Sequence, residues 1–207
     1  HILVDTGIRV VSNAYLASVT ENSIRCPDGQ ELGFDLLVVI PPHEGSDLIE
    51  AADLGDGLGF GRADKHTLKS TVAERVFLVG DNAGIPGSKA GSVAHFQAEA
   101  VVHNILREIA GKAAEPCADG HTNCFIETGH GKAVLIDFNH AVQPVPGKFP
   151  LPYIGPMDLL KETRLNHLGK LAFKHIYWNM LLPARQLPLV GSKMSMAGKK
   201  RQFLDRA

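Results

Sequence analysis

The 207-residue sequence has few cysteines, no long apolar run and almost no net charge. Its three cysteines, Cys26, Cys117 and Cys124, are too few and odd in number for a disulfide scaffold, which favours a reducing compartment. No run of 18 apolar residues is present, so no transmembrane helix is expected. A net charge of −1 carries no nucleic-acid signature, and neither a nucleic-acid partner nor a metal site is predicted.

The sequence also lacks an initiating methionine, a recognisable signal peptide and internal repeats. Because it starts at His1, we expect it to be a piece of a longer protein, so missing targeting information carries little meaning. The small net charge hides an asymmetry: residues 144–207 carry +8 and residues 1–143 carry −9. A basic last quarter on an acidic body predicts contact with an anionic surface.

The first segment, residues 1–42, is predicted to be a β-meander that ends a domain. Short strand-like runs surround Asp28-Gly29, which is a strong hairpin signal. The apolar run 34–40 is typical of a strand that is covered on both faces, and two prolines end it.

The second segment, residues 43–115, is predicted to combine a turn-rich stretch, one strand and one long helix. Alternating glycines at 55–61 do not have dinucleotide-loop spacing, so an irregular turn is favoured over a phosphate site. The run 76–79 is expected to be a strand. Apolar residues recur at helical spacing over 90–109, and Gly111 is a plausible terminator.

The third segment, residues 116–207, is predicted to hold two strands around a turn at 129–131 and then a helix. Five prolines make 144–156 extended. The run 156–182 is predicted to be an amphipathic helix that Pro183 stops. Its basic stripe is Lys161, Arg164, Lys170 and Lys174, and its apolar stripe is Leu160, Leu165, Leu168, Leu171, Ala172, Ile176 and Met180.

Two interpretations of this helix stay open. It either docks on the body of the protein with a solvated basic face, or its apolar stripe enters a membrane interface. Phe173, Tyr177 and Trp178 favour the membrane, because clustered aromatics and lysines suit an interfacial helix. The stripe is also suited to lining an apolar channel, which is compatible with membrane contact.

The strand-like run before Gly80-Asp81 and the glycine-rich turn after it carry the clearest chemistry. A carboxylate just past a strand can accept hydrogen bonds from a flavin's ribityl hydroxyls, and glycine lets the backbone approach closely. A helix opening near Ala90 presents free N–H groups, which stabilise the negative charge of a reduced flavin. Lys89 adds a full charge in this loop. The alternatives are an ordinary strand-ending turn and a solvated lysine.

These residues resemble a known family. Residues 64–97, and above all Ser88-Lys-Ala-Gly-Ser-Val-Ala-His-Phe-Gln97, resemble the second FAD-binding segment of sulfide:quinone oxidoreductases. These are FAD-dependent pyridine nucleotide–disulfide oxidoreductases. The run Gly120-His-Thr-Asn-Cys-Phe-Ile-Glu-Thr-Gly-His-Gly-Lys132 resembles the same branch, and the resemblance extends over nearly the whole chain.

The resemblance implies an α/β fold, or α+β for this segment taken alone. The chain would be the C-terminal half of a flavoprotein with two Rossmann-type domains. Residues 1–42 would end the second dinucleotide-type domain, 43–115 would be the returning part of the FAD domain, and 116–207 would be a helical region facing membrane and quinone. Gly80 and Asp81 would hold the ribityl chain of FAD, while Lys89, Ala90 and Gly91 would face the pyrimidine edge of its ring.

The resemblance also assigns redox chemistry to Cys124. This cysteine would accept sulfur from sulfide and pass two electrons to the flavin, with a lowered pKa beside the flavin and the helix N-terminus. His130 and Lys132 would deliver protons to a reduced quinone, although surface turn positions are an equal alternative. Cys26 and Cys117 are interpreted as structural or incidental.

The first FAD motif of the superfamily, Gly-x-Gly-x-x-Gly, and the partner cysteines are absent. We therefore expect these 207 residues alone to bind FAD weakly or not at all and to have no turnover. The whole protein would oxidise sulfide to polysulfide or sulfur and reduce a membrane quinone. It would be cytoplasmic or peripheral on the cell membrane, and a homo-oligomer is left open. The alternatives are a type II NADH:quinone dehydrogenase-like flavoprotein and a non-catalytic membrane-associating or oligomerisation module.

Overall fold

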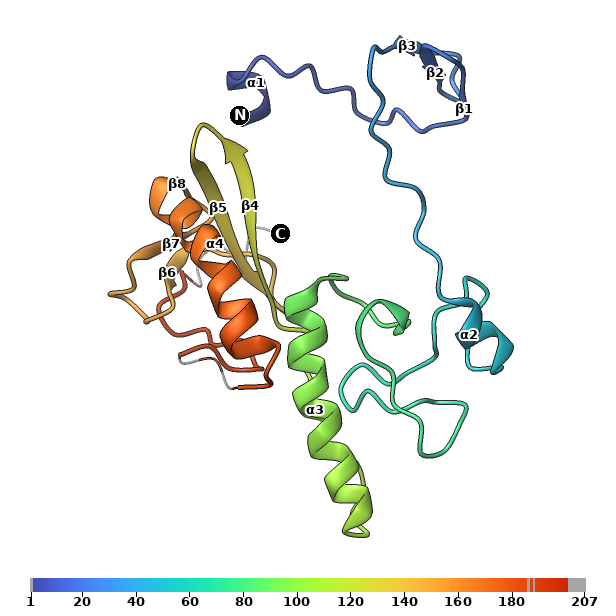
Figure 1. Cartoon of the computed structure of the whole chain (residues 1–207), viewed down its shortest axis with the longest axis vertical. Coiled ribbons are helices and arrows are strands. Elements are labelled where there is room, and N and C mark those ends of the chain that lie inside the picture. The colour runs from blue at the N-terminus through green and yellow to red at the C-terminus, as the bar shows by residue number, and fades with distance from the viewer. Residues whose placement is uncertain (1, 186, 188, 201–207) are drawn as a thin grey trace. The chain divides into compact units, whose positions relative to one another are not determined.

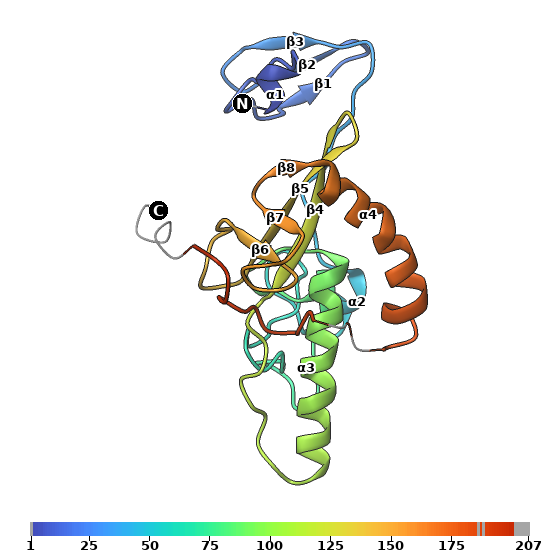
Figure 2. The ribbon, with the colours of Figure 1, turned by 90° about the vertical axis from the view of Figure 1, so that its left-hand side faces the viewer.

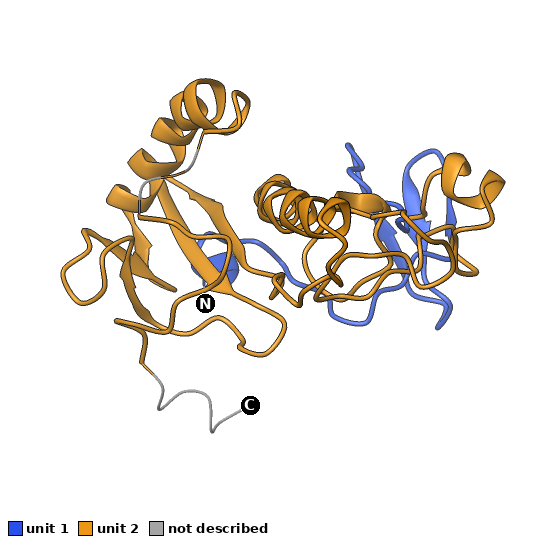
Figure 3. Ribbon diagram, turned by 90° about the horizontal axis from the view of Figure 1, so that it is seen from below, with its two compact units in different colours: residues 1–43 blue, residues 44–207 orange. Residues whose placement is uncertain are grey.

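The structure, a computed structural model, describes residues 2–185, 187 and 189–200. The chain divides into two compact units, His1–His43 and Glu44–Ala207 (Figure 3). The basic run predicted at the end of the chain, 199–201, extends beyond the described residues.

The first unit is a small antiparallel sheet. Its elements are α1 (Ile2–Asp5), β1 (Ser18–Val19), β2 (Ser23–Arg25) and β3 (Glu31–Gly33), with β2 in the middle. The predicted hairpin between β2 and β3 is confirmed. Gly29 has φ +87°, which favours glycine, and the Asp28 carboxylate accepts a hydrogen bond of 2.9 Å from the Gln30 amide.

The strand predicted over 34–40 does not form. Leu36, Val38 and Ile40 are each more than four-fifths exposed, and no strand within the described residues pairs with this run. A strand needs a neighbour to satisfy its backbone groups and to cover its side chains. The apolar pattern alone therefore does not make a strand here.

The second unit opens with turn-rich chain and the long helix of the molecule. Its first elements are α2 (Asp47–Ala51), the 3₁₀ turn η1 (Gly80–Asn82) and α3 (Gly91–Ile109) (Figure 1). The helix predicted over 90–109 is confirmed. It ends before Gly111, which has φ +70° and donates a 2.9 Å hydrogen bond from its N–H to Glu108 O. The strand predicted at 76–79 does not form. A single bridge pairs Lys69 with Phe77, and among the described residues no ladder of several pairs forms at this run.

The rest of the second unit is a sheet with a helix against it (Figure 2). Its strands are β4 (Thr122–Gly129), β5 (Lys132–Phe138), β6 (Gly147–Phe149), β7 (Met157–Leu159) and β8 (Glu162–Thr163). They run in the order β4-β5-β7-β6, with β8 beside β5. The predicted hairpin around 129–131 is confirmed. Ala133, Leu135 and Asp137 are buried on one face of β5, as a two-residue strand period requires.

The helix predicted over 156–182 begins later than expected. It is α4 (Arg164–Ile176), followed by a π-helical turn, η2 (Tyr177–Leu181). Thr163 caps it by accepting a 3.0 Å hydrogen bond from the Asn166 amide, and the buried Asn166 side chain donates to the carbonyls of Asp158 and Lys161. These contacts, with β7 and β8 upstream, explain why Pro156 does not start the helix.

Much of the apolar stripe of α4 faces outward. Leu168 and Leu171 on α4 and Trp178 on η2 are each 57% exposed. Among the helices that the structure describes, none combines the length and apolarity that a bilayer crossing requires.

Candidate functional site

The helix α3 begins with an open N-terminus. Ala90 is its N-cap in an extended conformation, and no side chain in the described part of the chain caps it. No described atom lies within 4 Å of the place where a Cβ on Gly91 would sit. The unpaired N–H groups and the positive end of the helix are therefore accessible to a ligand.

The Gly80-Asp81 turn is tied to the same helix. Gly80 has φ +65°, and its N–H donates a 2.6 Å hydrogen bond to Oε1 of the buried Gln97 on α3. The Asp81 side chain is exposed. Because Gln97 is seventeen residues away, only its place in the 88–97 motif signalled this role.

Lys89 holds the loop between the turn and the helix. Its ammonium donates to the carbonyls of Asp81 (2.9 Å) and Ala83 (2.8 Å) and lies 4.4 Å from the ring centre of Phe60. Burial lowers the pKa of Lys89, and the negative charges of Asp81 and Asp56 oppose that shift. Lys89 thus cross-links the loop through these two hydrogen bonds and is not an ordinary solvated side chain.

Cys124 lies on β4, opposite Ile136 of β5, and its side chain is partly buried. Burial raises the pKa of the Cys124 thiol, and a hydrogen bond with the Ser92 hydroxyl opposes this only in part. The lowered pKa was expected beside a bound flavin, and it stays a prediction; in the chain alone the pKa of Cys124 is raised. The Ser92 hydroxyl donates its one proton to Asn123 O at 3.1 Å, which joins α3 to β4 beside the thiol.

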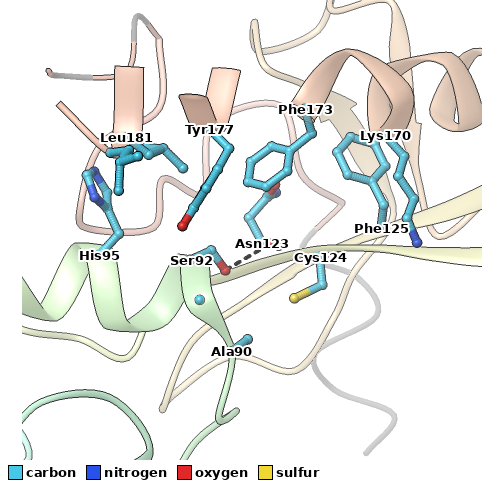
Figure 4. A pocket seen from close by; sticks show the side chains of 12 residues that line it. Ala90, Ser92, His95, Asn123, Cys124, Phe125, Lys170, Phe173, Tyr177 and Leu181 are labelled. Atoms are coloured by element: carbon cyan, nitrogen blue, oxygen red, sulfur yellow. Dashed lines mark hydrogen bonds between the residues drawn. The ribbon is translucent and has the colours of Figure 1, made fainter. Parts of the chain in front are cut away.

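One cavity of about 470 Å³, the cysteine cavity, joins the helix N-terminus to this thiol (Figure 4). It is lined by Ala90, Gly91, Ser92, His95, Asn123, Cys124, Phe125, Lys170, Phe173, Tyr177, Leu181 and Leu182. Figure 4 shows the rings of Phe125 and Phe173 between β4 and α4, and the thiol on the side nearer Ala90. A mostly apolar wall with a few polar groups is typical of a small-molecule site.

The other predicted site residues lie elsewhere. Gly80, Asp81 and Lys89 form the adjoining turn but do not line the cysteine cavity. His130 lies in the β4–β5 turn with φ +52°, and Lys132 forms a 3.0 Å ion pair with Glu162. Along the strand, Lys132 is roughly 13 Å from Ile136, the position opposite Cys124, at about 3.3 Å per residue.

The sequence reasoning gave no site role to Ser92, His95 or Phe125 of the cavity wall, and it assigned Lys170 to a basic stripe and Phe173 and Tyr177 to a membrane interface. Ser92 and His95 share one face of α3, and Lys170, Phe173, Tyr177 and Leu181 share one face of α4 and η2. Helical spacing indicated these faces, but only the tertiary structure brings them to β4.

The remaining cysteines make contacts of a structural kind. Cys26 is buried beside the hairpin of the first unit. The Cys117 thiol lies 3.5 Å from Ala100 O and 3.5 Å from Asn104 Nδ2, and burial raises its pKa.

A buried polar network lies at the base of the β4–β5 hairpin. Asp137 accepts a 2.7 Å contact from His121 Nε2, and its other oxygen is 2.7 Å from Lys199 Nζ. The His121 ring stacks on Phe96 of α3 at 4.7 Å, and its Nδ1 is 2.9 Å from Gly191 O. The network therefore ties α3, the hairpin and the segment near Lys199 together.

The sequence of the chain is similar to those of several known proteins. No family model matches the chain. It is 34% identical over 152 residues to the mitochondrial sulfide:quinone oxidoreductase of Schizosaccharomyces pombe, covering 72% of this chain and 32% of that protein. The corresponding proteins of Dictyostelium discoideum (30% identity; 77% and 34% covered) and Mus musculus (27%; 72% and 32%) also match. The chain thus spans about a third of the length of the curated relatives it matches.

Two solved structures share the fold. The sulfide:quinone oxidoreductase of Aquifex aeolicus aligns with TM-score 0.68 and 17% identity, over 86% of this chain and 43% of that one. A chain of the Tetrahymena thermophila mitochondrial ATP synthase aligns with TM-score 0.59 and 23% identity, over 85% and 41%. The expected mixed α/β fold is thereby confirmed. Over about three quarters of its length, the chain is similar in sequence to mitochondrial sulfide:quinone oxidoreductases.

Proposed function

We propose that the protein carrying this chain is an FAD-dependent enzyme that oxidises sulfide and reduces a quinone, with Cys124 as a sulfur-accepting thiol. The relatives named above support the reaction class. The observation that carries the proposal is the cysteine cavity, where one apolar space touches the thiol and the open N-terminus of α3 at Ala90 and Gly91.

The residues proposed to hold FAD fit that group in two respects. Gly91 leaves open space at an uncapped helix start, where backbone N–H groups can meet a negatively charged ring edge. Asp81 is exposed just after Gly80, where a carboxylate can accept bonds from hydroxyl groups. Lys89 would act by fixing the turn through its two carbonyl contacts. When bound, FAD would take up two electrons from sulfur and release them to a quinone.

Cys124 would carry the sulfur. Sulfide would attack Cys124 in a disulfide with a cysteine elsewhere in the complete protein: a persulfide forms on Cys124, the disulfide bond breaks, and the partner cysteine leaves as a thiolate that passes two electrons to FAD. Because the pKa of the thiol is raised, Cys124 would have to lose a proton before acting as a nucleophile. The Ser92 hydroxyl, which donates to Asn123 O here, would stabilise the thiolate by turning its proton from that carbonyl to the sulfur.

The quinone would occupy the aromatic end of the cysteine cavity. Phe125, Phe173 and Tyr177 present flat apolar surfaces, and a volume of about 470 Å³ is within the range for small-molecule sites. The exposed Leu171 and Trp178 on the outer face of α4 and η2 would rest on the membrane that holds the quinone.

Sulfide-dependent quinone reduction by the complete protein, with Cys124 replaced, tests the function. Cys124→Ser should lower the rate at least ~100-fold, because the sulfur carrier is removed. Cys117→Ser is the matched control, because Cys117 is also partly buried but does not line the cysteine cavity. This variant should retain the rate within about twofold. If Cys124→Ser leaves the rate unchanged, or NADH alone supports full turnover, the type II NADH:quinone dehydrogenase-like alternative is favoured.

Co-sedimentation with anionic liposomes tests the membrane contact separately. Leu171→Glu should weaken binding several-fold, because a charge replaces an exposed apolar side chain on the proposed face. Leu106→Glu, an equally exposed leucine on α3, is the control. Equal binding of the two variants would contradict the proposed membrane face.

A further inference from the structure

His95 stands between the cysteine cavity and a second, more polar space. That second space, the polar cavity, has a volume of about 900 Å³. Its charged and titratable lining residues are His95, Glu99, His103, Glu115, Cys117 and Lys193. Among the described residues, His95 is the one that lines both cavities. Figure 4 shows it on α3 facing Leu181 at the end of η2.

The imidazole of His95 is enclosed but has no fixed partner. Its side chain is 18% exposed, and Nε2 is buried without a hydrogen bond to any described residue. Glu99, one helical turn further on, places Oε1 3.6 Å from Nε2, just beyond hydrogen-bond distance. Phe96 contacts the ring in an edge-on arrangement at 5.9 Å. A small side-chain rotation is enough to make or break the bond to Glu99.

We propose that His95 delivers a proton from Glu99 and the polar cavity to the quinone in the cysteine cavity. This inference rests on the proposed function. Quinone reduction adds two electrons, which sulfide supplies, and two protons, one for each new O–H bond. In the step assigned here an N–H bond of the His95 imidazolium breaks and a quinone O–H bond forms. The neutral imidazole then regains a proton from water in the polar cavity, passed on by the Glu99 carboxylate.

Geometry favours His95 over the other polar groups of the cysteine cavity. Lys170 and Tyr177 line the cysteine cavity but not the polar cavity, and Lys170 is exposed. Histidine also exchanges protons near neutral pH, where an unperturbed lysine or tyrosine does not. His130 and Lys132, the groups that the sequence indicated for proton delivery, line neither cavity.

Stopped-flow measurements on the complete, FAD-loaded enzyme test this role. In His95→Gln, reduction of the flavin by sulfide should change less than twofold. Its reoxidation by a short-chain ubiquinone should slow by ~100-fold, which is typical of a lost general acid. Turnover with ferricyanide, which takes electrons without protons, should persist. Added imidazole should restore part of the quinone rate in His95→Ala, an effect that a merely structural residue would not show.

Equilibrium binding provides a readout that does not depend on turnover. The Kd of the same ubiquinone for the oxidised enzyme, measured by fluorescence quenching, should stay within about twofold in His95→Gln, because shape and polarity are kept. His167→Gln, on α4 and lining neither cavity, is the control and should match wild type in every assay.

Two results would overturn the role of His95. One is an unchanged quinone rate in His95→Gln, and the other is a parallel loss of the ferricyanide and quinone rates. A wild-type enzyme that reduces no quinone with sulfide would instead overturn the proposed function on which the inference rests.

Discussion

The two ends of the β4–β5 hairpin differ in almost every physical respect. At the base, Thr122 is fully buried and Asp137 is 4% exposed, within a network that reaches α3. At the tip, Gly131 has open space around it and Lys132 makes one partly exposed ion pair with Glu162. Cys124 belongs to the base, where its neighbours come from three elements.

This difference shows how closeness in sequence misleads along an extended strand. Cys124, His130 and Lys132 lie within nine positions, which suggested a shared site. A strand advances about 3.3 Å per residue, so the same spacing separates the base from the tip.

The largest expected effect comes from breaking the buried network at the base. Asp137→Ala leaves Lys199 without its carboxylate and His121 without its partner, and removing one partner of a buried ion pair costs about 3–5 kcal/mol. Urea unfolding of the purified chain measures this loss. Glu127→Ala, which removes a partly exposed carboxylate paired with His167 nearer the tip, should cost less than about 1 kcal/mol. Equal losses in the two variants would show that the base is not the more stable end.

A pair of glycine substitutions sharpens the comparison at a smaller scale. Gly120, which precedes β4, and Gly131, at the tip, have similar φ angles of +74° and +66°. A Cβ on Gly120 would lie 1.6 Å from the His140 ring, whereas a Cβ on Gly131 meets nothing within 4 Å. Gly120→Ala should therefore cost about 1–3 kcal/mol more than Gly131→Ala, the cost of overpacking. Similar unfolding midpoints for the two variants would contradict the close contact at Gly120.

Elements with strong local signals could be predicted from the sequence. The helical period and Gly111 gave α3 almost to the residue, and the turn at 129–131 gave the hairpin. The strand at 34–40 was wrong, because strand formation depends on a neighbour that a local pattern does not contain. The start of α4 was wrong because Thr163 and Asn166 cap it through contacts that proline patterns do not reveal.

Some residues of the candidate site could also be predicted from the sequence, and others could not. The resemblance singled out Ala90, Gly91 and Cys124, and the structure brings them to one cavity. Ser92 and His95 lie in the same motif but were passed over, since nothing local says which helix face meets β4. The three-domain division and the assigned roles stay predictions.

Cys124 offers a smaller effect that reports on the environment at the base. Because the pKa of the folded thiol is raised, less thiolate is present at pH 8 than in an ordinary cysteine. Alkylation of Cys124 by iodoacetamide in a Cys26→Ser, Cys117→Ser background should be several-fold slower than in urea, and the rate should keep rising above pH 9. Mass spectrometry follows the reaction. Faster alkylation in the folded chain would contradict the raised pKa.

The smallest effect is expected at the tip. Lys132→Ala removes a partly exposed ion pair, and His130→Gly relieves a positive φ, so neither variant disturbs the cysteine cavity. In the complete enzyme, each should keep sulfide-dependent quinone reduction within about twofold, whereas loss of a proton donor typically costs 100-fold or more. A loss of that size would mean that the tip meets the quinone in the complete protein. Proton delivery would then return to His130 and Lys132, and the base would keep only the sulfur chemistry.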